Sequence, residues 1–139
     1  MKISFILNGN KVNTEFSNDK PLLKMLREKF DVLSVKEGCG RGECGTCTLL
    51  LDGVPVAGCM VASGQVEGRT VTTLEGLKTD PIAENIIEAF IESGGVQCGF
   101  CTPGFIISSY ALLKKNPSPS REEIKKELSG NICRCTGYT

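Results

Sequence analysis

Eight cysteines in two groups of four constrain this chain of 139 residues more than any other feature. The first group, spaced C-x4-C-x2-C-x11-C, consists of Cys39, Cys44, Cys47 and Cys59. The second group, spaced C-x2-C-x31-C-x1-C, consists of Cys98, Cys101, Cys133 and Cys135. The first spacing is typical of plant-type [2Fe–2S] sites, in which three nearby cysteines are followed by a distant fourth. Two four-thiolate sites in one short chain favour a protein that stores and passes electrons.

The rest of the composition excludes several other kinds of chemistry. The chain has no histidine, which excludes His-dependent acid–base catalysis and every metal site with a histidine ligand. Its 16 basic and 16 acidic residues balance, so no charge excess indicates nucleic acid or a membrane surface as a partner. The first residues show neither an apolar h-region nor a small-residue cleavage site, so no signal peptide is expected, and no apolar run approaches the ~18 residues of a membrane span. We therefore expect a cytoplasmic protein, whose clustered cysteines stay reduced and bind metal.

Residues 1–78 are predicted to form a small mixed sheet packed on one helix. Asn8-Gly9 and Asp52-Gly53 are strong signals for tight hairpin turns. The expected strands cover residues 2–7, 11–16, 46–51, 54–57 and 66–73. Pro21 is suited to a first helical position, and an apolar stripe continues the helix to about Lys29. This is the ubiquitin-like, or β-grasp, arrangement of a plant-type ferredoxin-like domain.

After Leu77 the apolar period changes from two residues to 3.6, which predicts a second, helical domain at residues 79–139. One helix is expected from Asp80-Pro81 to about residue 92. Another opens at Thr102-Pro103, and its expected buried stripe consists of Phe105, Ile106, Tyr110 and Leu113. Ser120 and Glu123 form a capping box for a third helix, and Gly130 is suited to the left-handed position after it. A fourth helix is expected to begin at residues 136–138. The predicted fold class is α+β.

Glycines alternate with the cysteines of the first group, at positions 38, 40, 42 and 45. A loop that turns three thiolates toward one centre needs positive φ angles and close backbone approach, which glycine allows. Amides of such a loop also hydrogen-bond cluster sulfur and tune its reduction potential. Zinc accepts four cysteines and stays an alternative. Residues 40–45 match G-x-G-x-x-G as well, but a strand follows them where a dinucleotide site needs a helix.

Each cysteine pair of the second group stands directly before an expected helix start. Amides and the positive end of the helix dipole stabilise anionic sulfur there, so two facing helix starts would present four thiolates to one cluster. Taken alone, Cys98-Gly-Phe-Cys101 is also compatible with a thioredoxin-like redox pair or half a zinc site. Its expected surroundings are helical, whereas a thioredoxin pair needs a βαβ unit. A purely structural role for the group stays open.

Three longer motifs stand in order along the chain: EGCGRGECGTC at 37–47, QCGFCTPG at 97–104 and SGNICRCTGY at 129–138. Together they resemble the iron–sulfur small subunit of the molybdenum hydroxylases, the xanthine dehydrogenase family, over essentially the whole chain. The resemblance implies an electron-transfer subunit of a multi-subunit oxidoreductase. It implies two [2Fe–2S] clusters, one in each domain, and no catalytic residue or substrate site in this chain.

The resemblance also implies partners and an order of electron flow. In this family a large subunit carries molybdenum–molybdopterin, where substrate is hydroxylated, and a medium subunit carries FAD. The second cysteine group would hold the cluster nearer molybdenum, and the first group the cluster nearer the flavin. Gln97 and Cys135 would lie beside the molybdopterin. Family members usually continue through a further helix, so the last helix is expected to be truncated here.

Two other functions remain compatible with the residues themselves. One is a free-standing two-cluster ferredoxin or redox sensor, and the other is a zinc-stabilised interaction module. Each oxidised cluster with its four thiolates carries a charge of about −2, because ligating thiols are deprotonated. Glycine-loop amides, helix starts and two arginines, Arg41 and Arg134, are the candidate groups to balance that charge.

Overall fold

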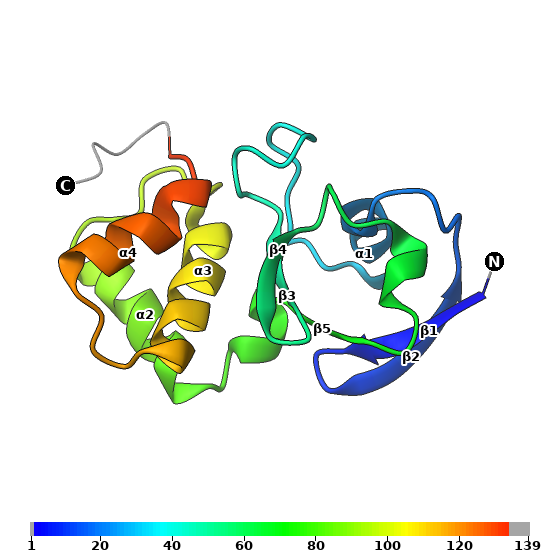
Figure 1. Cartoon of the computed structure of the whole chain (residues 1–139), viewed down its shortest axis with the longest axis horizontal. Coiled ribbons are helices and arrows are strands. Elements are labelled where there is room, and N and C mark those ends of the chain that lie inside the picture. The colour runs from blue at the N-terminus through cyan, green and yellow to red at the C-terminus, as the bar shows by residue number, and fades with distance from the viewer. Residues whose placement is uncertain (1, 134–139) are drawn as a thin grey trace.

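A computed structural model describes residues 2–133 of the chain and shows a sheet with one helix followed by a group of helices (Figure 1). The strands are β1 (Lys2–Leu7), β2 (Asn10–Glu15), β3 (Thr48–Leu51), β4 (Val54–Ala57) and β5 (Thr70–Thr72). The α-helices are α1 (Leu22–Phe30), α2 (Pro81–Glu92), α3 (Thr102–Lys115) and α4 (Arg121–Glu127). Short 3-10 turns cover Ser63–Val66, Leu74–Leu77 and Leu128–Gly130. The protein is therefore mixed α+β, as predicted.

The five strands form one sheet in the order β2-β1-β5-β3-β4. All neighbours pair antiparallel except β1 and β5, which run parallel. Both predicted hairpin turns are confirmed, because Asn8 and Gly9 have φ of 50° and 86°, and Asp52 and Gly53 have φ of 51° and 82°. The predicted strand 66–73 is too long: Val66 ends a 3-10 turn, and only the three residues of β5 extend.

Helix α1 packs its apolar stripe on one face of this sheet. Leu22, Met25 and Leu26 are fully buried, in one core with sheet residues such as Phe5 and Leu49. Pro21 precedes the helix in an extended conformation (ψ 140°) instead of opening it, because it forms an isolated β-bridge with the segment at residue 62. The helix therefore begins one residue later than predicted.

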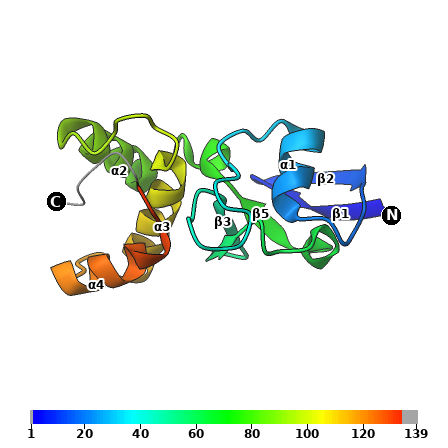
Figure 2. The same cartoon turned by 90° about the horizontal axis from the view of Figure 1, so that it is seen from above.

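The second half of the chain packs on the other face of the sheet, through β3. Leu50 belongs to a core with Ile106, Ile107 and Tyr110, whereas its neighbours Leu49 and Leu51 face the α1 core. Figure 2 shows α3 beside β3 in the view from above. Successive residues of a strand point to opposite faces, so the run Leu49–Leu51 is buried on both sides. Strand β3 thus contributes side chains to the hydrophobic cores of both halves.

The helical half follows most of its sequence signals. Phe105, Ile106 and Tyr110 are buried as predicted, and Leu113 is only partly buried. The Ser120 capping box is confirmed: Ser120 Oγ accepts from Glu123 N–H at 3.2 Å, and Glu123 Oε1 accepts from Ser120 N–H at 3.1 Å.

The left-handed position predicted for Gly130 is wrong. The last turn of α4 tightens into a 3-10 turn, which is closed by Asn131 N–H donating to Leu128 O at 3.0 Å, so no positive φ is needed. The helix expected at residues 136–138 lies outside the described residues. Within residues 2–133, no helix has both the length and the apolar character to cross a membrane.

Asp80 ties the start of α2 to α3. Its carboxylate accepts from Ile82 N–H at 2.9 Å and from the Tyr110 hydroxyl at 2.8 Å. These hydrogen bonds, led by the one from Tyr110, hold the pKa of Asp80 below its usual value. Because the folded pKa is lowered, the stabilisation is complete above about pH 5 and is lost only as the pH falls through the folded value.

Asp80→Ala should therefore lower the free energy of unfolding by about 1–2 kcal/mol, the usual range for losing an N-cap. Thermal unfolding at pH 6 and pH 8 should give the same loss, since Asp80 is ionised at both. The control is Glu88→Ala, an exposed position in the same helix. A loss that differs between these two pH values would contradict the assignment to an ionised Asp80.

Candidate metal centres

Three cysteines of the first group lie in a loop between α1 and β3, and the fourth, Cys59, follows β4. The glycines of this loop have the conformations that the sequence predicts. Gly40, Gly42 and Gly45 have φ of 69°, 77° and 77°. Gly38 has no positive φ, but a Cβ there would lie 2.7 Å from Cys44 Sγ and 2.8 Å from Thr46 Oγ1. Three of the glycines thus allow the chain to turn, and the fourth allows close approach to a thiol.

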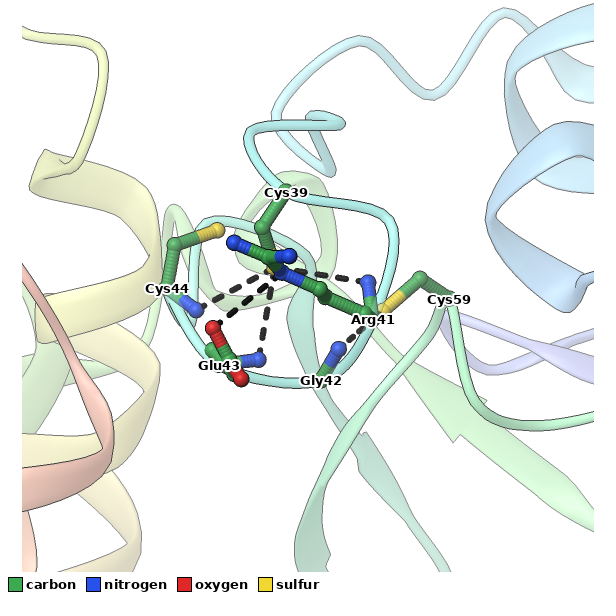
Figure 3. Close-up of polar contacts among 6 residues, drawn as sticks. All are labelled: Cys39, Arg41, Gly42, Glu43, Cys44 and Cys59. Atoms are coloured by element: carbon green, nitrogen blue, oxygen red, sulfur yellow. Dashed lines mark hydrogen bonds and ion pairs between the residues drawn. The ribbon is translucent and has the colours of Figure 1, made fainter.

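Backbone amides of this loop point at the sulfur atoms (Figure 3). Cys39 Sγ accepts from the N–H groups of residues 41, 43 and 44 at 3.4, 3.3 and 3.3 Å. Cys59 Sγ accepts from Gly42 N–H at 3.2 Å. These donors, with Arg41 N–H first, lower the pKa of the Cys39 thiol to about 6. The loop therefore stabilises anionic sulfur before any metal is bound.

The four thiols of the first group are arranged as two pairs. The side chain of Cys39 interacts with that of Cys44, and the side chain of Cys47 interacts with that of Cys59 and, by charge alone, with that of Cys44. Burial raises the pKa of the Cys47 thiol to about 12. In the described part of the chain, no three cysteine or carboxylate side chains surround one point as a single metal ion requires. Two pairs of thiolates are the donor set that a two-iron cluster needs.

Three cysteines of the second group, Cys98, Cys101 and Cys133, line one cavity near the start of α3. Cys101 directly precedes the helix as its N-cap residue, as the sequence predicts. Its side chain interacts with that of Cys133, and burial raises the pKa of the Cys101 thiol to about 11. Cys98 is exposed, and Cys133 is buried. Cys135, the fourth member, and Arg134 lie outside the described residues.

The two cysteine groups face each other across a direct backbone contact. Ile132 N–H, next to Cys133, donates to Cys44 O at 2.8 Å. A cavity of about 450 Å³ lies between the groups. Its lining includes Cys44 from the first group and Cys98, Cys101 and Cys133 from the second. The proximity of the two groups is thus a property of the folded chain.

A buried asparagine fixes this contact, and sequence reasoning missed it. Asn131 Nδ2 donates to Gly45 O at 3.1 Å, and Asn131 Oδ1 accepts from the Ser108 hydroxyl at 2.7 Å. Gly104 also approaches so closely that a Cβ there would lie 2.3 Å from Gly45 O. Asn131 stands within a recognised motif, but no local pattern links it to a residue 86 positions earlier.

Gln97 lies at a second, larger cavity of about 820 Å³ in the helical half. The cavity lining includes Cys101 and Cys133, apolar residues of α2, α3 and α4, and the basic residues Arg121 and Lys125. The Gln97 side chain is exposed there, one residue before the exposed Cys98.

Arg41, a candidate to balance cluster charge, pairs with Glu43 at 3.2 Å, and both side chains are largely exposed.

Two family patterns match the chain, one in each half. The family described as "2Fe-2S iron-sulfur cluster binding domain" matches residues 5–77. The family described as "[2Fe-2S] binding domain" matches residues 73–139. Together they span both cysteine groups.

Relatives and solved structures agree with this match. The chain is 48% identical over 136 residues to the nicotinate dehydrogenase small FeS subunit of Eubacterium barkeri, covering 98% of this chain and 87% of that protein. It is 42% identical to the xanthine dehydrogenase iron-sulfur-binding subunit of Escherichia coli O157:H7, covering 98% and 86%. It superposes on quinoline 2-oxidoreductase from Pseudomonas putida 86 with a TM-score of 0.92 at 38% identity, covering 99% of this chain and 85% of that chain. The chain therefore belongs to the family of [2Fe–2S] small subunits of the xanthine dehydrogenase-type molybdenum hydroxylases, and is a subunit of an oxidoreductase.

Proposed function

We propose that the chain holds two [2Fe–2S] clusters and carries electrons between redox centres on two larger partner subunits. The first cluster is assigned to Cys39, Cys44, Cys47 and Cys59. The second is assigned to Cys98, Cys101, Cys133 and Cys135. The observation that carries this proposal is the direct contact of the two cysteine groups, in which Ile132 N–H donates to Cys44 O at 2.8 Å.

The residues present fit two anionic clusters. The paired thiols of the first group match two irons with two thiolates each, and the amides around Cys39 and Cys59 supply donors to sulfur. Cys101 directly precedes α3, so a thiolate bound to a cluster there would lie near the positive end of the helix dipole, although burial raises the pKa of the free thiol. When bound, each cluster would supply storage of one electron at a time.

The chain's own residues control how such a cluster is bound. Cys39, with a pKa of about 6, is a thiolate at neutral pH. Cys47 and Cys101, with pKa values of about 12 and 11, must release their Sγ protons on binding, so assembly should release protons. The loop amides are fixed in place and need no rearrangement when charge on sulfur increases.

We divide the chain into a β-grasp, plant-type ferredoxin-like domain at 1–78 and a helical domain at 79–139. The strand order β2-β1-β5-β3-β4 with α1 on one face supports the first, and the helices from Pro81 onward support the second. The second cluster faces a large molybdopterin subunit, with Gln97 and Cys135 beside the pterin. The first cluster faces a medium subunit that carries FAD. The exposed Gln97 and Cys98 leave one end of the helical domain open to such a partner.

The test is to coexpress the chain with the proposed large and medium subunits of the same enzyme. We expect the three proteins to copurify, and the purified complex to show two reduced-cluster EPR signals. Substrate alone should then bleach the iron–sulfur absorption of the complex and leave the isolated chain unchanged. Nicotinate and xanthine, named in relatives, are the first substrates to try. A two-cluster chain that binds neither subunit would instead be a free ferredoxin.

A further inference from the structure

The backbone of Lys36 lies in the loop between α1 and β3, the first cysteine loop, which holds Cys39, Cys44 and Cys47. Its ammonium group lies at residues 98–101, the second cysteine loop. Lys36 N–H donates to Thr46 O at 3.1 Å, and the Thr46 hydroxyl donates to Lys36 O at 3.1 Å. The same hydroxyl lies 3.1 Å from Cys44 Sγ. The main chain of Lys36 is therefore held beside the ligands assigned to the first cluster.

The side chain of Lys36 reaches in the other direction. Its Nζ donates to Gly99 O and to Phe100 O, each at 3.5 Å. It also lies 5.3 Å from the centroid of the Phe100 ring. Gly99 and Phe100 are the two residues between Cys98 and Cys101. One cation thus contacts the loop that joins two ligands assigned to the second cluster.

The second cysteine loop has no charge of its own in this region. There is no Lys, Arg, Asp or Glu in residues 93–113. This segment contains Cys98, Cys101 and most of α3. Arg121 and Lys125 line the larger cavity on the α4 side, which Cys101 and Cys133 also line. Lys36 belongs to the first half of the chain, and its ammonium group contacts the second cysteine loop from the side of the first cysteine group.

We propose that Lys36 raises the reduction potential of the second cluster and so favours entry of the electron from the molybdenum side. This inference rests on the proposed function. Reduction by one electron takes a cluster of charge about −2 to about −3, and a nearby cation stabilises the more negative state. The contact at Gly99 and Phe100 places that cation against the second cluster's loop, so the first cluster should respond less.

The experiment is a redox titration of the holoprotein in which EPR follows both reduced clusters separately. At the wild-type midpoint of the second cluster, Lys36→Met should lower its ratio of reduced to oxidised form about tenfold, which is 59 mV for a one-electron couple. Lys36→Gln should do the same, which guards against a defect specific to methionine. The same ratio for the first cluster should change less than about threefold.

Two controls separate local charge from other effects. Lys36→Arg keeps the cation and should stay within about twofold of wild type. Lys20→Met removes an equal charge from a lysine that lies over Phe16, at 5.8 Å from the ring, and should also leave the ratio unchanged. If Lys36→Met shows both EPR signals and the reduced-to-oxidised ratio of its second cluster is unchanged, the role of Lys36 is overturned and the two-cluster proposal stands. Equal shifts in Lys20→Met or Lys36→Arg would also overturn that role. Absence of the second signal in wild-type protein would overturn the proposed function itself.

Discussion

Gly104→Ala should separate the two halves of the chain at the point where the cysteine groups meet. A Cβ at Gly104 would lie 2.3 Å from Gly45 O, a backbone atom that cannot rotate away. Either α3 or the first cysteine loop must then move, which strains the Asn131 hydrogen bond to Gly45 and the Ile132 hydrogen bond to Cys44. We expect a loss of about 1–3 kcal/mol in the free energy of unfolding, the usual cost of overpacking.

Thermal unfolding measures this loss, and pulsed EPR between the two reduced clusters measures their separation. Gly130→Ala is the matched control, because it adds the same methyl group beside Asn131 where nothing lies within 4 Å of the new atom. The control should stay within about 0.5 kcal/mol of wild type and keep the same separation. A Gly104→Ala protein that matches this control in both measurements would refute the close contact of α3 with the first loop.

Cys44→Ser should remove the first cluster and leave the second in place. A serine hydroxyl does not supply the thiolate that iron–sulfur clusters require, and the Cys39 partner would lose its pair. The purified variant should keep about half of the wild-type iron and show one reduced-cluster EPR signal where wild type shows two. Iron assay and EPR on the same sample give both results.

Glu43→Gln is the control for this loop, since the Glu43 side chain is exposed and forms an ion pair with the equally exposed Arg41. It should keep all of its iron and both signals. Loss of both signals in Cys44→Ser would show that the two sites do not assemble independently. That outcome would contradict the assignment of separate quartets.

Features set by neighbouring residues could be predicted from the sequence. Asn8-Gly9, Asp52-Gly53 and the Ser120 capping box each depend on a few adjacent residues, and each forms as expected. The glycine-rich loop of the first cysteine group is equally local. The left-handed position of Gly130 failed because the chain after α4 is held by Asn131, whose partners lie in distant segments.

Features that join distant segments could not be predicted in this way. Leu50 reads as an ordinary strand residue, yet it packs in the helical core while its neighbours pack on α1. The contacts of Asn131 with Gly45, and of Lys36 with Phe100, span 86 and 64 positions in the chain. No periodicity or spacing in the sequence predicts such pairs, because they form only when the folded sheet half packs against the folded helical half. The ligand role of Cys135 stays a prediction, outside the described residues.

The most direct test of the account is an assay of iron and acid-labile sulfide in protein isolated without oxygen. Two [2Fe–2S] clusters predict about four irons and about four sulfides per chain, in red-brown protein. Colourless protein that contains stoichiometric zinc and no sulfide would contradict the central claim.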